Sequence, residues 1–302
     1  MEYDLIVVGA GPAGLTASIY AKRFGLKVLV IGEEIGGLLN ICGEIRNYPG
    51  FVKIEGTELL KKFYEHALSY EVEIAQGTVT NIKKEGPLFK VETSIGSFKA
   101  RAIIIATGSK KKKLGIEGEE EFKGKGVCYC TVCDAPLTKG KKVGVVGCGN
   151  SACESALLLS NYAEKVYLFC KHPELKCDEI LKEKVEREEK IEVICNANIK
   201  KIFGEERMKG ALFEIGGEEK KIEMDFLFVE IGREPSLELA TKLGLKIEDS
   251  LIKVDEKLRT SQEGIFAAGD ITTGSSKFCQ IITACAEGAI AAKSVYEYLT
   301  SA

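Results

Sequence analysis

Two glycine-rich turns, each between a short apolar run and a helix-forming segment, constrain the fold of this chain more than any other feature. The first is Gly9-Ala10-Gly11-Pro12-Ala13-Gly14, and the second is Gly147-Cys148-Gly149-Asn150-Ser151-Ala152. In a strand–turn–helix unit, the first glycine permits the tight turn and the second lets the backbone approach a pyrophosphate. The third small residue allows the helix to pack closely on the strand, and alanine is tolerated there. Each turn therefore predicts a dinucleotide-binding unit.

The residues that follow each turn indicate which nucleotide it prefers. Glu33 and Glu34 come about 20 residues after the first turn, where a carboxylate can bind a ribose hydroxyl. After the second turn, a strand expected at 165–169 runs into Lys171 and His172, with Lys176 beyond. Basic side chains there suit the 2′-phosphate of NADP, whereas an acidic one would favour NAD. A solvated basic loop is the alternative, since lysine and histidine make poorer phosphate forks than arginine.

Two dinucleotide sites in a chain of 302 residues imply electron transfer between a nicotinamide and a bound flavin. Further strands are expected to end at Ala106-Thr107-Gly108, at Gly232 and at Gly269-Asp270. The Asp270 carboxylate could then reach the ribityl hydroxyls of a flavin. A helix is expected from Gln280 to Leu299, with its N-terminus toward the electron-rich edge of the flavin.

The order of these segments predicts an α/β fold with two Rossmann-like, three-layer nucleotide-binding domains, the second inserted into the first. The flavin domain is expected at residues 1–115 and 246–302, and the nicotinamide domain at 116–245. Residues 80–103 alternate between apolar and polar and contain turn residues, so they predict a small antiparallel excursion.

Cys128, Cys130, Cys133 and Asp134 form a cluster just ahead of the second turn. A structural zinc site needs about four ligands, usually as two spaced pairs; the chain has only two histidines and this single CxxC, so no metal is expected. Cys130 and Cys133 have the spacing of a redox pair, in which one thiol attacks and the other resolves the mixed disulfide. Asp134 could move a proton to and from the pair. Cys128 is expected to be a buried neighbour, with a redox role as the alternative.

A redox pair inside the inserted domain must meet the flavin to be reduced and an outside partner to be oxidised. One rigid arrangement does not easily serve both, so a swivel of the inserted domain is a natural inference.

Composition excludes several classes of protein. The net charge of −3 gives no footprint for nucleic acid or an anionic membrane. The N-terminus lacks the features of a signal peptide, and no apolar run reaches about 18 residues. The 11 cysteines are odd in number in a large chain, so most should be reduced, buried thiols. A soluble cytoplasmic protein is expected.

The chain resembles the low-molecular-weight thioredoxin reductase family over essentially its whole length. The motifs "GAGPAGLTA", "NYPGF", "IATGS", "CTVCD", "VVGCGNSA", "AAGD" and "QIITACAEG" occur in family order. The resemblance implies a homodimer in which NADPH reduces FAD, and FAD reduces the Cys130–Cys133 disulfide. Cys133 would be the thiol near the flavin, Cys130 the thiol that attacks the disulfide of a thioredoxin- or glutaredoxin-like protein, and Asp134 the acid/base.

The same resemblance implies the FAD-binding residues. FAD would contact the first turn, the loop at Glu33, Glu34, Gly36, Gly37 and Leu38, and also Asn47, Ala106, Thr107, Gly108, Gly269, Asp270, Gln280 and Ile281. From the positions of the second turn and of the strand ends, and not from the resemblance, the nicotinamide coenzyme is expected to contact Gly147, Gly149, Asn150, Ser151, Ala152, Lys171, His172, Lys176 and Gly232.

Three positions depart from the family pattern. Cys170-Lys171-His172 stands where an arginine-rich run is usual, Cys279-Gln280 lacks an arginine, and Leu38 replaces a glutamine. NADH, a reduced deazaflavin coenzyme or ferredoxin are therefore alternative donors. A non-catalytic redox sensor is the alternative from another class.

Overall fold

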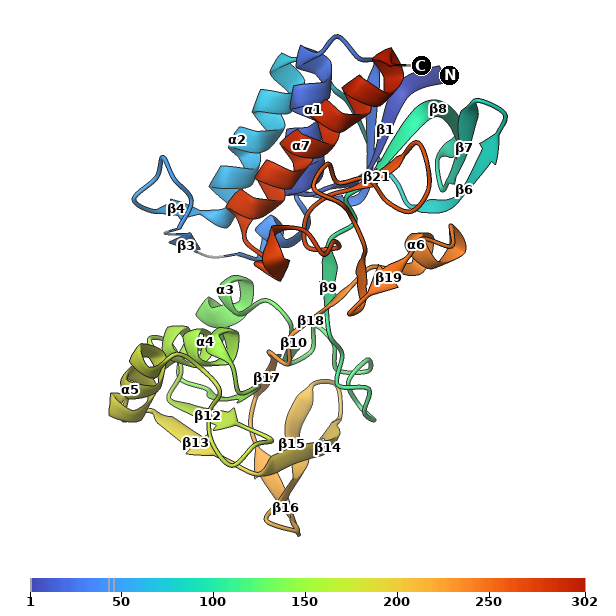
Figure 1. Ribbon diagram of the computed structural model, residues 1–302. Helices are drawn as coiled ribbons and strands as arrows, with labels where there is room; N and C mark the ends of the chain where they lie inside the picture. Colours follow the sequence, from blue (N-terminus) through green and yellow to red (C-terminus); the bar gives the residue numbers. More distant parts are fainter. Residues whose placement is uncertain (1, 43, 46, 302) are drawn as a thin grey trace. The chain divides into compact units, whose positions relative to one another are not determined.

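The computed structural model describes residues 2–42, 44–45 and 47–301, and these form two compact units (Figure 1). Unit 1 comprises Met1–Lys110 and Pro235–Ala302, and unit 2 is Lys111–Glu234. Both units are built on parallel sheets, and unit 2 is inserted into the sequence of unit 1. The predicted α/β class is therefore confirmed.

Unit 1 contains a sheet in the order β5-β2-β1-β8-β7-β6, with β21 also paired to β8. β1, β2, β5, β8 and β21 run parallel, whereas β6 and β7 form the predicted antiparallel excursion. These elements are β1 (Glu2–Ala10), β2 (Val28–Ile35), β5 (Glu73–Gln76), β6 (Val79–Glu85), β7 (Leu88–Thr93), β8 (Gly96–Ile105) and β21 (Ile265–Ala267).

Three helices lie side by side over one face of this sheet (Figure 1). They are α1 (Pro12–Arg23), α2 (Gly56–Ser69) and α7 (Ile281–Thr300), so the helix predicted from Gln280 begins one residue later. The shorter elements of unit 1 are η1 (Gly37–Ile41), β3 (Glu44–Ile45), β4 (Ile54–Glu55), α6 (Glu238–Lys242), β19 (Ile247–Glu248), β20 (Leu251–Ile252) and η3 (Ser275–Lys277).

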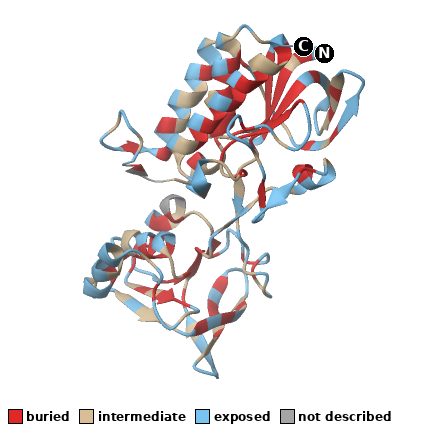
Figure 2. Ribbon diagram, viewed as in Figure 1, coloured by how far each residue is buried: buried red, intermediate tan, exposed pale blue. Residues whose placement is uncertain are grey.

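Alternation along the strands builds two cores in unit 1. On β1, Leu5 and Val7 pack with the helices, whereas Ile6 and Val8 face the opposite core. Successive side chains of a strand point to opposite faces, so an unbroken apolar run marks a strand that is covered on both sides. Buried residues accordingly fill the central strands (Figure 2).

Unit 2 has a parallel sheet in the order β10-β17-β11-β12-β13 and a separate antiparallel sheet β14-β15-β16. Phe226 and Phe228 of β17 pack with α4 in one core, and Leu227 and Val229 pack against the antiparallel sheet in the other. The elements are β10 (Val127–Cys128), α3 (Thr131–Asp134), η2 (Ala135–Thr138), β11 (Lys142–Val146), α4 (Asn150–Ser160), β12 (Lys165–Phe169), α5 (Glu179–Arg187), β13 (Ile191–Ile194), β14 (Ala197–Gly204), β15 (Met208–Ile215), β16 (Glu218–Glu223) and β17 (Phe226–Val229).

The units divide at 110/111 and 234/235, not at the expected 115/116 and 245/246. Leu239, Ala240 and Leu245 are buried in the core of unit 1, so the segment after 234 belongs there. Leu114 and Ile116 pack against a core of unit 2, so unit 2 begins earlier in the sequence than expected. At the two junctions, β9 (Ser109–Lys111) pairs with β18 (Arg233–Pro235).

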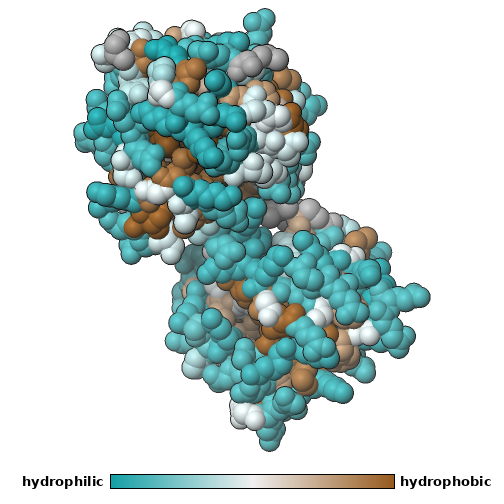
Figure 3. All heavy atoms as spheres, turned by 90° about the vertical axis from the view of Figure 1, so that its right-hand side faces the viewer, coloured by the Kyte–Doolittle hydropathy of each residue, from teal (hydrophilic) through white to brown (hydrophobic). Residues whose placement is uncertain are grey.

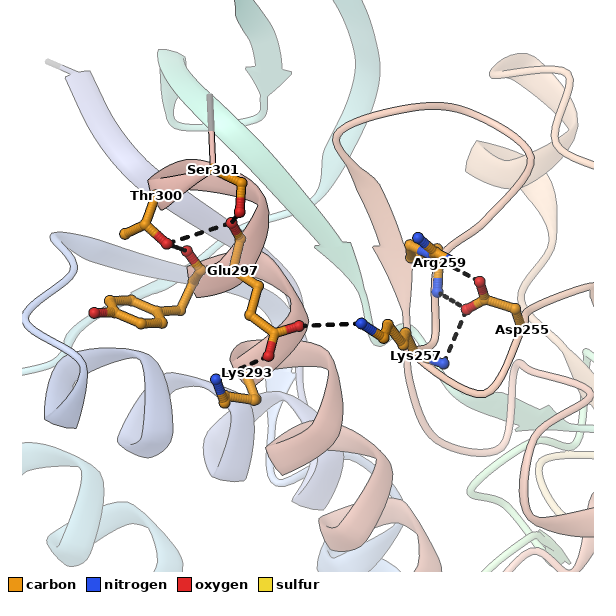
Figure 4. Close-up of polar contacts among 8 residues, drawn as sticks. Asp255, Lys257, Arg259, Lys293, Glu297, Thr300 and Ser301 are labelled. Atoms are coloured by element: carbon orange, nitrogen blue, oxygen red, sulfur yellow. Dashed lines mark hydrogen bonds and ion pairs between the residues drawn. The ribbon is translucent and has the colours of Figure 1, made fainter.

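One ion pair joins α7, near its C-terminal end, to the loop before β21, and further pairs lie within the helix and within the loop (Figure 4). Glu297 lies 3.4 Å from Lys257 Nζ and 2.9 Å from Lys293 Nζ, and Arg259 Nε lies 2.6 Å from Asp255. These pairs are exposed and screened by solvent, so each contributes little to stability. The Glu297–Lys257 pair links the loop to the helix.

Hydrophilic side chains predominate on the face of the molecule shown in Figure 3. Within the part of the chain that the structure describes, no helix is both long and apolar enough to cross a membrane.

Candidate functional sites

The first glycine turn joins β1 to α1 and leaves open space in front of the helix. A Cβ on Gly9, whose φ is +114°, would lie 2.1 Å from the Ala106 carbonyl oxygen, and one on Gly14 would lie 1.9 Å from the Gly9 carbonyl oxygen. The fold itself therefore requires these two glycines. At Gly11, φ is −81° and no described atom lies within 4 Å of a Cβ position. Nothing described in the protein requires a glycine there, and the open space admits a ligand.

The N-terminus of α1 faces this space with free backbone donors. Pro12 stands in the first turn, and no side chain in the described residues caps the helix at Gly11. The first N–H groups of a helix have no intrahelical acceptor and lie at the positive end of its dipole. Such an end binds an anionic phosphate. The first turn therefore fits the pyrophosphate of a dinucleotide.

The other residues predicted to bind FAD follow the strands of unit 1. Parallel strands bring their carboxyl ends to one edge of a sheet, where α/β proteins bind ligands. Asn47 Nδ2 donates to Gln280 Oε1 at 2.9 Å, which joins two predicted residues far apart in the sequence. Glu33 and Glu34 are exposed on β2, Gly36 precedes η1, Gly37 and Leu38 lie in η1, Ala106-Thr107-Gly108 follow β8, Gly269-Asp270 follow β21, and Ile281 begins α7.

The second turn, between β11 and α4, repeats the pattern of the first. A Cβ on Gly147 would lie 2.2 Å from the Glu230 carbonyl oxygen, so the turn packs directly against the end of β17. At Gly149, the nearest atom to a Cβ position is the Lys176 carbonyl oxygen at 3.9 Å. No side chain of the described chain caps α4, which begins with Asn150, Ser151 and Ala152. This turn, too, has room for a phosphate in front of a helix.

The basic segment after β12 folds back to the second turn. The Lys176 N–H donates to the Cys148 carbonyl oxygen at 2.7 Å. Burial, and then the charges of Lys176 and Lys171, lower the pKa of His172, so these three predicted residues lie near one another. Gly232 follows β17, and its carbonyl oxygen accepts the Lys112 N–H at 3.0 Å.

An acidic side chain that the sequence analysis missed also borders this turn. Asn150 Nδ2 donates to Asp178 Oδ2 at 2.8 Å, and the Asp178 N–H donates to Asn150 Oδ1 at 2.9 Å. The pair fixes Asn150 at the start of α4.

The cysteine motif lies between β10 and η2 in unit 2. Cys130 is disulfide-bonded, and its carbonyl oxygen accepts the Asp134 N–H at 3.2 Å across the short helix α3. The side chain of Cys133 lies outside the described part of the structure, so the predicted pairing stays a prediction. A disulfide and the second glycine turn therefore lie in the same unit.

Comparison with known proteins identifies the family of this chain. Residues 3–288 match the pyridine nucleotide-disulphide oxidoreductase family. A thioredoxin reductase from Bacillus subtilis is 39% identical, with 98% of this chain and 95% of the relative covered. The chain belongs to this family, and within it to the low-molecular-weight thioredoxin reductases. The predicted family is confirmed.

Solved structures of the family share the fold. The crystal structure of thioredoxin reductase from Lactococcus lactis is 36% identical with a TM-score of 0.92, covering 99% of this chain and 100% of that one. The structure of T. acidophilum thioredoxin reductase is also 36% identical, with a TM-score of 0.89 and 99% of each chain covered. Membership of the family implies a flavin and a pyridine nucleotide, and the two open glycine turns fit two such dinucleotides.

Cys128 is a buried thiol beside Asp134. It is reduced, and its Sγ lies 3.8 Å from the Gly126 carbonyl oxygen. Burial, and then the charge and hydrogen bond of the Asp134 carboxylate, raise the pKa of Cys128 well above that of an ordinary thiol. A thiol is reactive as its thiolate, so the raised pKa disfavours reaction at Cys128. The burial of Cys128 is as expected, and a redox role stays the alternative.

Five further thiols lie close together at the second turn, which itself contributes Cys148. Burial and hydrogen bonding to Cys177 raise the pKa of Cys153, and burial and hydrogen bonding to Cys148 raise that of Cys170, with Cys195 nearby. All five are reduced. No group of three or more His, Cys, Asp or Glu side chains suited to a metal is found among the described residues. These cysteines pack as small apolar side chains.

Two carboxylates that the sequence analysis missed are buried next to predicted sites. Glu287 lies within the apolar stretch of α7, and Glu230 directly follows the apolar run of β17. A lone acidic residue in an apolar run is an informative signal, because carboxylates are almost never buried without partners. That signal alone could have singled out both positions.

Proposed function

We propose that this protein is a thioredoxin-disulfide reductase that uses NADPH and FAD. The observation that carries the proposal is the disulfide at Cys130, one residue before α3, in the unit that also holds the second glycine turn. Family membership supports the reaction class. The flavin, when bound, passes electrons from the nicotinamide to a disulfide as a pair.

The first turn would hold FAD and the second NADPH. Gly11 and Gly149 leave space for the two pyrophosphates, and the N-termini of α1 and α4 supply N–H donors. Lys171, His172 and Lys176 would bind the 2′-phosphate that distinguishes NADPH from NADH.

Cys130 and Cys133 would carry the electrons to the partner. Two electrons and two protons convert their disulfide into two thiols, and the Cys130 thiolate then attacks the disulfide of thioredoxin. Cys133 displaces the reduced partner by attacking the mixed disulfide, so that the Cys130–Cys133 bond forms again. Asp134, at the end of α3, would accept and return the proton.

The donor is tested by anaerobic titration of the flavoprotein with NADPH, NADH and a reduced deazaflavin, following loss of flavin absorbance. NADPH should bleach the flavin at the lowest concentration. Bleaching by the deazaflavin alone would contradict the choice of donor. A Lys171→Ala/His172→Ala variant should raise the KM for NADPH more than that for NADH, and equal effects would remove the role in 2′-phosphate binding.

The partner and the thiol chemistry are tested by turnover with thioredoxin, with a glutaredoxin-like protein as a second substrate. Cys130→Ser should abolish reduction of thioredoxin while NADPH still bleaches the flavin. Normal turnover by that variant would overturn the mechanism.

A further inference from the structure

A buried polar network adjoins the redox motif and has no role in the function proposed above. Thr131, directly after Cys130, is 5% exposed. Its Oγ1 lies 2.9 Å from Ser155 Oγ on α4 and 3.3 Å from Glu230 Oε1. Ser155 Oγ also donates to Glu230 Oε1, at 3.2 Å. The three groups satisfy one another, which matters because a buried polar group without a partner is costly.

The second oxygen of the same carboxylate pairs with a cation. Glu230 Oε2 lies 2.5 Å from Lys111 Nζ, and the two side chains are 6% and 16% exposed. Breaking such a pair by removing one partner is strongly unfavourable, because it leaves a buried charge uncompensated. Glu230 is therefore held firmly and can in turn hold the Thr131 hydroxyl.

The network reaches both ends of unit 2. Lys111 is the first residue of the unit and lies on β9, and Glu230 directly follows β17, shortly before the chain leaves the unit at Glu234. The start of the redox helix α3 is thus linked, through the Glu230 carboxylate, to Lys111 at the start of the unit.

The residue on the other side of Cys130 is anchored in the same way. The Tyr129 hydroxyl donates to the carboxylate of Glu119, which is 2% exposed. That carboxylate also accepts the N–H groups of Leu114 at 2.6 Å and Gly115 at 2.7 Å. Both neighbours of Cys130 are therefore fixed to the segment that enters unit 2.

We propose that Glu230 is a positioning residue for the redox pair, acting through the hydroxyl of Thr131; this inference rests on the proposed function. A disulfide forms only when its two cysteines have a specific distance and orientation. Holding the start of α3 in place therefore favours formation of the Cys130–Cys133 bond. Without the Thr131–Glu230 contact, the start of α3 loosens and the equilibrium shifts toward the dithiol.

The equilibrium is measured against glutathione. In this exchange the Cys130–Cys133 bond breaks, two glutathione thiols are oxidised to one glutathione disulfide, and their two protons pass to the protein thiols. The purified flavoprotein is equilibrated at a series of glutathione ratios, quenched with an alkylating reagent, and its oxidised and reduced forms are counted by mass spectrometry. Neither a nucleotide nor a protein partner is needed.

The variants are chosen to separate the hydroxyl from the rest of the side chain. Thr131→Val removes only the hydroxyl, Thr131→Ser keeps it, and Glu230→Gln removes the charge. The control is Glu214→Gln, which breaks an ion pair of the same 2.5 Å length to Lys200, where the side chains are 44% and 40% exposed.

Thr131→Val should shift the equilibrium constant toward the dithiol by about tenfold, the effect of one hydrogen bond to a charged group. Glu230→Gln keeps an acceptor oxygen but loses the charge, so it should shift the constant in the same direction by less. Thr131→Ser and Glu214→Gln should match the wild type. Combining Thr131→Val with Glu230→Gln should add little to Thr131→Val alone, because both act through one contact.

The proposal is overturned if Thr131→Val and Thr131→Ser behave alike, or if the Thr131→Val and Glu230→Gln effects simply add. If Glu230→Gln fails to fold, the comparison of valine with serine still decides. Failure of the wild type to reduce thioredoxin, with the predicted shifts intact, would refute the proposed function and leave the positioning role standing.

Discussion

Glu287 Oε2 accepts the backbone N–H of Gly269 at 2.8 Å and thereby joins α7 to the end of β21. The same oxygen accepts the Thr272 hydroxyl at 2.8 Å, and Glu287 is 4% exposed. A Cβ on Gly274 would lie 2.6 Å from the other carboxylate oxygen, so the loop closes around this side chain. The loop begins at Gly269-Asp270, which we propose binds the flavin.

Glu287→Ala should release the flavin and destabilise unit 1. The change leaves two buried donors without an acceptor, at a cost of about 1–3 kcal/mol each. Glu287→Gln keeps one acceptor oxygen and should retain most of the flavin. The flavin-to-protein absorbance ratio after gel filtration, with thermal unfolding, measures both effects. Glu297→Ala, an exposed change on the same helix, is the control. Equal flavin loss in the glutamine and alanine variants would contradict the role of the acceptor.

Gly11→Ala and Gly149→Ala should each disable one nucleotide site without harming the fold. Neither added methyl group lies closer than 3.9 Å to a described atom, so stability should change by about 1 kcal/mol or less. Gly11→Ala should lower flavin content, and Gly149→Ala should keep the flavin but raise the KM for NADPH about tenfold, which is about 1.4 kcal/mol. Gly14→Ala, whose methyl group would overlap the Gly9 carbonyl, should fail to fold. A Gly149→Ala variant that lost flavin instead would contradict the assignment of the two turns.

Cys128 should remain unlabelled when the reduced protein is treated with an alkylating reagent near neutral pH. Its raised pKa leaves almost no thiolate, whereas Cys130 must form a thiolate to act. Peptide mass mapping after brief labelling distinguishes the two. Cys128→Ala should retain turnover. If this variant folds but is inactive, Cys128 has a redox role.

NADPH binding should weaken as pH rises through the pKa that His172 has in the complex. Burial, Lys176 and Lys171 lower that pKa in the free protein, whereas a 2′-phosphate favours the protonated imidazole and raises it. Binding therefore takes up a proton and is stronger on the acidic side. The dissociation constant of NADPH should lose this pH dependence in His172→Gln, and that of NADH should lack it in the wild type. Parallel pH profiles for the two nucleotides would place the phosphate elsewhere.

The lowered pKa of His172 also makes the stability of the folded state depend on pH. Because the folded state lowers the pKa of His172, the unfolded chain binds this proton more readily. His172 therefore destabilises the folded state below the ordinary histidine pKa, and the effect disappears as pH rises above it. His172→Gln should gain stability relative to the wild type only in acid, as judged by unfolding at several pH values.

Local patterns predicted the elements that carry the sites. The strand expected at 165–169 is β12, and the alternation across 80–103 is the β6–β8 excursion. Glycine turns and apolar runs are short-range signals, so one sequence suffices to read them. The same holds for the CxxC motif.

Long-range contacts could not be predicted in this way. The domain boundary after Glu234 depends on the packing of Leu239 and Leu245 into unit 1, and period alone does not say which core an apolar residue joins. The partnership of Thr131 with Glu230 joins residues 99 positions apart. Only the folded sheet brings the end of β17 beside α3.

The insertion of unit 2 also sets an order for the growing chain. A Cβ on Gly288 of α7 would lie 2.2 Å from the Ala13 carbonyl oxygen, so the last helix is pressed directly against the first. During synthesis, every strand of unit 2 has been made by Glu234, whereas β21 and α7 of unit 1 are added only afterwards. Domains generally fold as units as the chain emerges. Unit 1 is thus the first unit to begin synthesis and the last to be completed. The apolar face of α1 that packs against α7 stays uncovered until α7 has been made.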